Sequence, residues 1–321
     1  MINRVLIRIK VLQLLYSYML NRDDVNGYER DMQQELAACF EDCYLLYFHL
    51  LKLPVDLTYL RLRRLDDAMY NNTLTSNRID PANDRFVNNK VVAALEHDEV
   101  MARFVDTHPD VAWDRDALFL KRMLDKVLES EPYRWYMSRQ ETTIIDDGRL
   151  WRQLLHDVLF NDEEFLQNIE ETNSMWSEDD VELIGQFALK TLKQIEYGNM
   201  QPMLPMFREP DDRYDDWESD AHFGERLMRA TLANYENNSQ LIDSLINGKK
   251  WDAERIAVMD RIILCMAIAE VIEFDTIPAV VTINEAVELA KNFSTDNSGA
   301  YVNGILHSAI VKLRADGVIL K

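Results

Sequence analysis

Glycine and proline are scarce in this 321-residue chain, which contains only nine Gly and eight Pro. Strand-like alternation of apolar and polar residues is also hard to find, although 47% of the residues are hydrophobic. Because glycine and proline mark turns and interrupt helices, their scarcity favours helices. We therefore expect an all-α fold, with ample length for a hydrophobic core.

Several kinds of chemistry are also missing. The nine glycines are too dispersed for a GxGxxG motif or a phosphate-binding loop. The six histidines show no HExxH pattern and no pairing with cysteine at metal-ligand spacing, and there is no GxSxG motif. We expect no enzymatic activity, no cofactor and no metal site.

Cysteine is rare as well, since Cys39, Cys43 and Cys265 are the only three and form no CxxC motif. Cys39 and Cys43 are one helical turn apart, which suits two small core residues better than a disulfide or a metal site. No segment reaches the ~18 uninterrupted apolar residues of a membrane span. These features predict a cytoplasmic protein that does not contact membranes.

The formal net charge of −21 argues against a general nucleic-acid binder, because phosphate contacts need Lys and Arg. The charge is unevenly distributed. Residues 1–20 carry +3 and residues 251–321 carry −4, so residues 21–250 carry −20. We therefore expect any RNA site near the two ends of the chain.

The N-terminal part predicts three helices. The first runs from about Asn3 to Leu20 and is apolar nearly all round, and the second runs from about Tyr28 to Leu53, ending at Pro54. The third spans about 55–71. It contains a basic cluster followed at once by two acids, so we interpret it as a salt-bridged surface rather than an RNA contact. The cluster and its acids are Arg61, Arg63, Arg64, Asp66 and Asp67.

Four to six further helices are predicted between Asp80 and Tyr197, and four tryptophans in this acidic region suggest that it folds. Ser177 and Asp180 are placed to cap the helix that ends at Gly198. Residues 199–220 read as an acidic linker. Breaks are expected at His108-Pro109, Glu131-Pro132, Asp146-Asp147-Gly148 and Asn173-Ser174.

The last third predicts helices at about 220–235, 238–247, 252–273, 282–293 and 298–315, with Gly317 as the final terminator. Thr282 and Glu285 have the spacing of a capping box. The loop before the last helix is rich in hydroxyl and amide groups. It lies beside Lys291, and Tyr301 follows in or near the first helical turn. Free N–H groups at a helix start suit a phosphate, and an exposed aromatic ring suits an unstacked base.

Three segments, in order along the chain, resemble the NusB family of transcription antitermination factors. They are RVLIRIKVLQLLYSYML in the first helix, Met259 to Leu264 continuing to Glu270, and Ile277-Pro278 through INEAVELAK to YVNGIL. The third is the most specific. The resemblance implies two small helical bundles with an additional helical insertion. It divides the chain into N-terminal NusB-like helices (1–54), an acidic insertion and linker (55–216) and a C-terminal NusB-like bundle (217–321).

The resemblance also implies a function and partners. NusB proteins bind single-stranded boxA RNA of ribosomal RNA transcripts together with the small ribosomal protein NusE, within the RNA polymerase antitermination complex. A homodimer is left open. Carried over by position, Arg4, Arg8 and Lys10 would contact phosphates, and Gln13 and Tyr16 would border the RNA. Lys291 would contact the RNA backbone, and the bases would contact Asn297, Ser298 and Tyr301.

Other roles are expected for some of the matching residues. Tyr16 fits a core position better than an RNA contact, and Glu270 fits a buried, hydrogen-bonded carboxylate that holds the bundle. Asn303 and Gly304 are expected to let a neighbouring helix come close. Two alternatives to an RNA-binding factor stay open. One is a protein-interaction scaffold whose acidic insertion excludes or mimics RNA, and the other is an RNA-modifying enzyme that uses a NusB-like domain for targeting.

Overall fold

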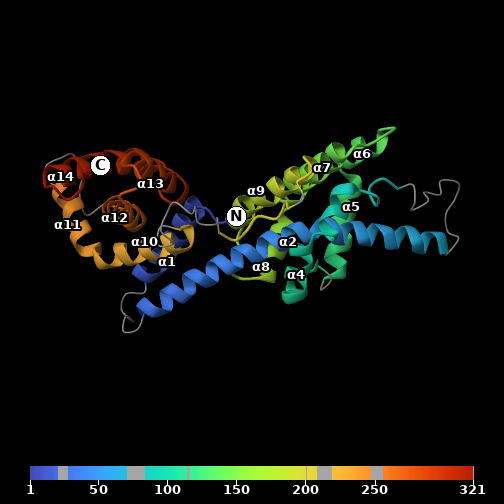
Figure 1. The fold of residues 1–321 in the computed structure, drawn as a ribbon, viewed down its shortest axis with the longest axis horizontal. Coiled ribbons are helices and arrows are strands. Elements are labelled where there is room, and N and C mark those ends of the chain that lie inside the picture. The colour runs from blue at the N-terminus through green and yellow to red at the C-terminus, as the bar shows by residue number, and fades with distance from the viewer. Residues whose placement is uncertain are drawn as a thin grey trace. The chain divides into compact units, whose positions relative to one another are not determined.

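The computed structural model describes residues 1–20, 28–70, 84–113, 116–199, 201–207, 219–246 and 256–320. Within these ranges the regular structure is helical, apart from an isolated bridge between Ile2 and Phe207, which confirms the all-α prediction (Figure 1). The elements are α1 (Arg4–Leu20), α2 (Tyr28–Tyr70), α3 (Lys90–Glu96), α4 (Glu99–Thr107), the 3-10 helix η3 (Pro109–Val111), α5 (Ala117–Glu129), α6 (Glu131–Ser138), α7 (Ile144–Gln153), the π-helix η5 (Leu154–Leu159), α8 (Glu163–Thr172), α9 (Glu178–Glu196), α10 (Asp220–Ala233), α11 (Tyr235–Ile246), α12 (Val258–Glu273), α13 (Ala279–Phe293) and α14 (Ser298–Ala315).

The chain divides into two compact units. Residues 2–39 and 207–321 form the first, here called the terminal unit, and residues 40–206 with Met1 form the second, the central unit. The chain therefore passes from one unit to the other within α2 and again after Met206. The domain limits at 54/55 and 216/217 stay predictions.

Helix α12 forms the middle of the terminal unit. Its residues from Ile262 to Val271 are all buried, because the sequence IILCMAIAEV is apolar on every side except at Glu270. Helices α1, α10, α11, α13 and α14 pack against it (Figure 1). A helix that is apolar all round is expected at the centre of a bundle.

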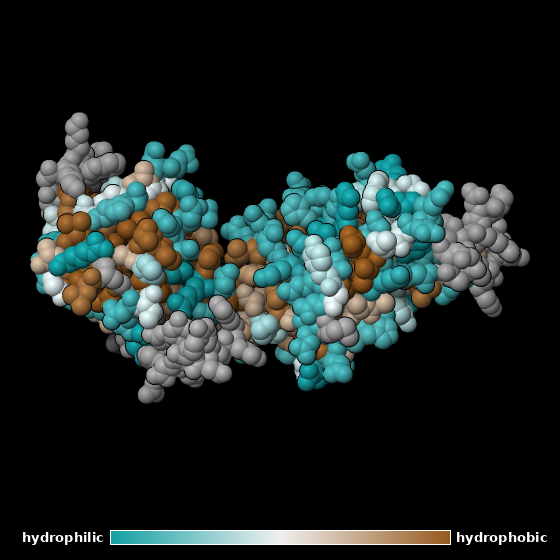
Figure 2. All heavy atoms as spheres, turned by 45° about the horizontal axis from the view of Figure 1, so that its top comes forward, coloured by the Kyte–Doolittle hydropathy of each residue, from teal (hydrophilic) through white to brown (hydrophobic). Residues whose placement is uncertain are grey.

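Buried aromatic side chains fill the central unit. Tyr47, Phe48, Trp113, Trp151 and Trp176 are each at most 4% exposed, which confirms that this acidic region folds. The visible face of the central unit in Figure 2 is mostly hydrophilic, whereas that of the terminal unit has larger hydrophobic areas.

Two predicted helix breaks are wrong. Helix α2 continues through Pro54, because buried apolar residues on both sides of it, from Leu50 to Leu57, keep the helix packed despite the cost of ~3 kcal/mol for an internal proline. Asp147 and Gly148 lie inside α7, which starts with a capping box between Thr143 and Asp146. Asp147 is buried there because its carboxylate accepts hydrogen bonds from other elements.

Most predicted helix ends are confirmed. Ser177 and Asp180 form a capping box at the start of α9, and Gly198 and Gly317 have φ values of +76° and +70° just after helices. The breaks at 108–109, 131–132 and 173–174 match helix ends within one or two residues. Most of the acidic linker and the start of the helix predicted at 252 lie outside the described residues.

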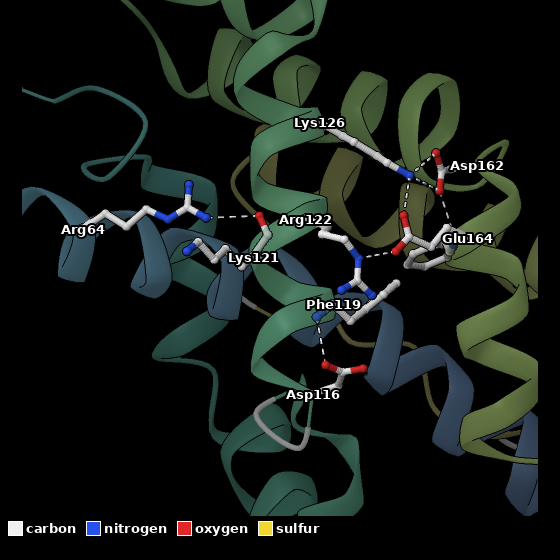
Figure 3. Close-up of polar contacts among 9 residues, drawn as sticks. Arg64, Asp116, Phe119, Lys121, Arg122, Lys126, Asp162 and Glu164 are labelled. Atoms are coloured by element: carbon white, nitrogen blue, oxygen red, sulfur yellow. Dashed lines mark hydrogen bonds and ion pairs between the residues drawn. The ribbon is translucent and has the colours of Figure 1, made fainter.

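Two of the three arginines in the basic cluster of α2 form ion pairs, as predicted for the cluster, although not with the acids that follow it in sequence. Arg61 pairs with Asp84 at 3.2 Å, and Arg64 pairs with Asp125. Arg64 also donates to the Lys121 carbonyl oxygen at 3.1 Å (Figure 3). Nearby, the Lys126 ammonium lies between the carboxylates of Asp162 and Glu164 and ties α5 to the start of α8 (Figure 3). These pairs hold together segments that are far apart in sequence.

The three cysteines are buried and none forms a disulfide, which confirms their interpretation as core residues. Burial raises the pKa of the Cys265 thiol to about 11.

In the part of the chain that the structure describes, no helix is both long enough and apolar enough to cross a membrane.

Candidate nucleic-acid interface

Arg8 and Glu270 form a buried ion pair at the meeting point of α1 and α12. The Arg8 Nε and Nη2 atoms donate to the two Glu270 carboxylate oxygens, each at 2.7 Å. The side chains are 5% and 2% exposed. This geometry confirms Glu270 as a buried carboxylate that holds the bundle, and the carboxylate occupies the Nε–Nη2 edge of the Arg8 guanidinium.

Thr282 belongs to the same cluster, which corrects the expected capping box. Helix α13 begins at Ala279, so Thr282 lies inside it rather than at its start. Its hydroxyl donates to Glu270 Oε1 at 2.7 Å, and the Glu285 carboxylate lies 3.7 Å from Arg8 Nη1. A residue pair with capping-box spacing thus contributes to a tertiary network instead.

Arg4 lies one turn before Arg8 on α1 and reaches α10. Its Nε donates to Asp220 Oδ1 at 2.8 Å, and its side chain is 35% exposed. The guanidinium groups of Arg4 and Arg8 lie 5.0 and 5.1 Å from the centre of the Phe223 ring. Phe223 therefore supports both arginines through cation–π contacts.

Ser298 is the centre of a second polar cluster, at the start of α14. Its hydroxyl donates to Asp260 Oδ2 at 2.9 Å, and it also contacts the hydroxyl groups of Thr295 and Ser294 at 2.8 and 3.1 Å. A hydroxyl has one proton, so donation to the Asp260 carboxylate makes Ser298 the acceptor from its neighbours. The cluster fixes the polar loop onto the first turn of α12.

The N-terminus of α14 is not capped by a side chain. Asn297 occupies the cap position with its side chain exposed, and no side-chain hydrogen bond caps the helix. The first N–H groups of an α-helix have no partner within the helix, so this end can accept an anion.

Lys291 lies beside this helix end. Its ammonium pairs with Glu288 at 2.6 Å, and its side chain is 55% exposed. A Cβ atom on Gly299 would lie 3.0 Å from Lys291 Cγ, so the glycine lets the lysine stem pass close to α14. Tyr301 is half-buried in the first turn, and burial, together with Asp260, raises the pKa of its hydroxyl. The tyrosine therefore stays neutral.

The remaining predicted site residues lie along α1. Lys10 is buried, whereas Gln13 and Tyr16 are half-buried. Asn303 and Gly304 do not allow a close helix approach as expected, because both are exposed and a Cβ on Gly304 would meet nothing within 4 Å. The predicted residues thus fall into an α1 group and an α13–α14 loop group.

Helix α12 links the two groups. Asp260 anchors the loop group and Glu270 anchors the α1 group, and ten residues of helix separate them by ~15 Å. Asp260 and Phe223 were not predicted as site residues. Asp260 stands inside the second NusB-like segment, so that signal was present, whereas nothing local to Phe223 indicates that two arginines would stack on it.

The fold and this site define an all-helical protein with a polar, partly basic surface at helix ends. Comparison with known proteins makes the assignment specific. Residues 185–310 match the model of the NusB family.

Curated relatives agree. The chain is 36% identical over 137 residues to a transcription antitermination protein NusB of Salinibacter ruber, covering 42% of this chain and 82% of the relative. It is 39% identical over 134 residues to the NusB protein of Symbiobacterium thermophilum, covering 39% and 85%. It is 40% identical over 120 residues to that of Bacillus licheniformis, covering 37% and 87%.

The chain belongs to the NusB family. No solved structure matches it. More than half of the chain lies outside each of these matches, which agrees with an insertion relative to its relatives.

Proposed function

We propose that this protein is a transcription antitermination factor that binds single-stranded boxA-type RNA together with the small ribosomal protein NusE and has no catalytic step. The observation that carries the proposal is the α13–α14 loop. An uncapped helix start, the exposed Lys291 and the half-buried Tyr301 adjoin there, in a chain whose relatives are named transcription antitermination proteins.

We divide the predicted site into contact and support residues. We assign the partly exposed Arg4 and the exposed Lys291 to phosphates. We assign the exposed Asn297 and the half-buried Tyr301 to bases. Arg8 and Ser298 support them. Arg8 Nη1 donates to the Arg4 carbonyl oxygen at 3.2 Å, and Ser298 holds the loop to Asp260. Gln13 and Tyr16 border the α1 group, and Lys10 is buried on the same helix.

Exposed apolar residues of the terminal unit support a protein partner. Val280 and Val281 at the start of α13 are 59% and 40% exposed, and Val311 on α14 is 65% exposed. Isolated apolar residues are common on surfaces, but neighbours at one helix end suit a protein contact. We propose that NusE, or a second copy of this chain, covers such a surface.

The test is fluorescence anisotropy of a labelled boxA-like RNA, titrated with the full chain with and without NusE across a range of salt concentrations. Tighter binding in the presence of NusE, and selectivity over a scrambled strand, would support the proposal. Equal binding of both strands at every salt concentration would contradict it.

A protein-interaction scaffold is the second candidate, and the charge of the central unit favours it. Residues 40–206 contain 31 acidic and 18 basic side chains. Such an excess repels an RNA backbone and can also mimic one. Capture of NusE by a chain that binds no RNA would favour this scaffold.

A further inference from the structure

A basic groove lies in the central unit, between the α7–η5 segment and α9. It encloses about 490 Å³ and is lined mainly by cationic and amide side chains. These are Arg152, Gln153, His156, Gln186, Lys190 and Lys193. Among the described residues that line the groove, Asp157 is the only acid, although acids outnumber bases in the central unit by 31 to 18. The local charge is thus opposite to that of its surroundings.

The two lysines of the groove are available to a ligand. Lys190 and Lys193 are exposed, and within the described chain neither ammonium forms an ion pair. Arg152 differs, because its Nε and Nη2 bond to the buried Glu196 at 2.6 and 3.2 Å. Arg152 is therefore held rigidly at the groove wall while the lysines can move to meet an anion.

One face of α9 carries the groove onward to an aromatic side chain. Four residues follow one another at helical spacing along this face, namely Gln186, Lys190, Lys193 and Tyr197. Tyr197 is 76% exposed. An exposed ring beside cationic side chains is the combination that holds single-stranded nucleic acid, since the ring stacks on a base and the cations meet phosphates.

The opposite wall contains the π-helical turn η5, from Leu154 to Leu159. It carries the exposed His156, whose Nδ1 lies 2.7 Å from Asp157 Oδ1. Single π-helical turns are rare and often occur at functional sites. Here the turn contributes His156 and Asp157 to the groove, and both belong to the central unit.

We infer that this groove binds the backbone of single-stranded RNA, with Lys190 and Lys193 on phosphates and Tyr197 on a base. The inference rests on the proposed function in taking RNA as the ligand, and it assigns an RNA contact to the central unit itself. Because positive charges dominate the groove, the contact is expected to be independent of base sequence.

The experiment uses the full chain and two RNAs, a boxA-like strand and a short oligouridine, both carrying 4-thiouridine for cross-linking. The K190Q/K193Q variant removes both ammonium groups. It is expected to lower the affinity for both RNAs by the same factor. It should also lower the slope of log Kd against log salt concentration by about 1.4, at ~0.7 per phosphate contact. Cross-links are expected in the peptide that contains Tyr197.

The R103Q/K121Q variant is the matched control. It removes the same charge from exposed positions on α4 and α5, which do not line the groove. Its RNA affinity is expected to change less than that of K190Q/K193Q, and its salt slope is expected to stay the same. Equal effects of the two double variants would overturn the inference, because general electrostatics would then explain both.

The outcomes separate the groove from the proposed function. If the boxA strand is not preferred but K190Q/K193Q still lowers oligouridine affinity, the proposed function fails and the groove stands. If boxA is bound selectively, while K190Q/K193Q binds like the unmodified chain and no cross-link falls in 149–157 or 186–197, the groove is overturned. If uridine monophosphate binding falls by the same factor as strand binding, the ligand is a mononucleotide and the RNA assignment is overturned.

Discussion

The Arg8 guanidinium and the Glu270 carboxylate meet through two hydrogen bonds of 2.7 Å, with both side chains almost fully buried. The pair joins α1, at the start of the chain, to α12, 262 positions later. Thr282 adds a third hydrogen bond from α13. The first helix is thus fixed to the C-terminal helices by charge pairing as well as by apolar packing.

Breaking this pair should destabilise the terminal unit strongly. Arg8→Met leaves the Glu270 charge buried without its partner, so we expect a loss of about 3–5 kcal/mol in the free energy of unfolding. The double variant Arg8→Met/Glu270→Leu removes both charges and should recover most of that loss. Urea unfolding, monitored by circular dichroism, measures the unfolding free energy of both variants. A double variant no better than the single one would contradict the charge-based explanation.

Two glycines within helices should respond in opposite ways to alanine. At Gly148 an added Cβ would clash with the Glu196 side chain, which Arg152 holds in place, so Gly148→Ala should cost about 1–3 kcal/mol. At Gly304 nothing lies within 4 Å, so Gly304→Ala should stabilise α14 by about 0.5–1 kcal/mol. Thermal unfolding of the two variants compares them directly.

His49 should make stability depend on pH. Its Nδ1 donates to the Val111 carbonyl oxygen at 2.8 Å and its ring stacks on Trp113, and burial lowers its pKa to about 4. In the unfolded chain the pKa of this histidine is ~6.5, so above pH 6.5 the ring is neutral in both states and protonation costs no stability. As the pH falls from 6.5 to 4, only the unfolded chain takes up this proton, so the free energy of unfolding decreases by about 3 kcal/mol.

The variant His49→Asn tests this dependence, because asparagine can still donate to Val111 but does not titrate. Unfolding free energies measured in urea between pH 4 and 7.5 should show a smaller slope for the variant than for the unmodified chain. Identical slopes would mean that His49 does not contribute, and that carboxylates alone set the acid sensitivity.

Tyr301→Ala should weaken binding to a boxA-like strand by about 1–3 kcal/mol, the usual value of one stacked base. Tyr301→Phe keeps the ring and should bind almost as well as the unmodified chain. Fluorescence anisotropy of the labelled strand gives both affinities. If the alanine variant binds with unchanged affinity, Tyr301 is not part of the site.

Arg4→Ala should act differently from the Tyr301 variants. Because Arg4 is proposed to contact a phosphate, its loss should weaken the binding of all RNAs by about the same factor and lower the salt slope by about 0.7. Anisotropy with the boxA-like and scrambled strands across a range of salt concentrations measures this. A loss confined to the boxA-like strand would assign Arg4 to base recognition instead.

Helix positions and most of their ends could be predicted from local patterns, such as the capping residues of α9 and the glycine after α14. Prediction failed where tertiary contacts override local preference. Packing carries α2 through Pro54, and Thr282 bonds to Glu270 instead of capping a helix. The site residues themselves came from a family resemblance. Their partners Asp220 and Phe223 come from other segments, so no local pattern reveals them, whereas Asp260 lies within the second NusB-like segment.

The burial of all three cysteines makes site-specific chemistry on this protein straightforward. Cys39 and Cys43 are 8% and 3% exposed, and Cys265 is fully buried with its pKa raised to about 11. Thiolates, not thiols, react with alkylating probes, so the native residues should stay unlabelled at neutral pH. A single cysteine introduced at an exposed position, such as Lys193→Cys or Lys291→Cys, would then carry a spectroscopic probe in the otherwise native chain.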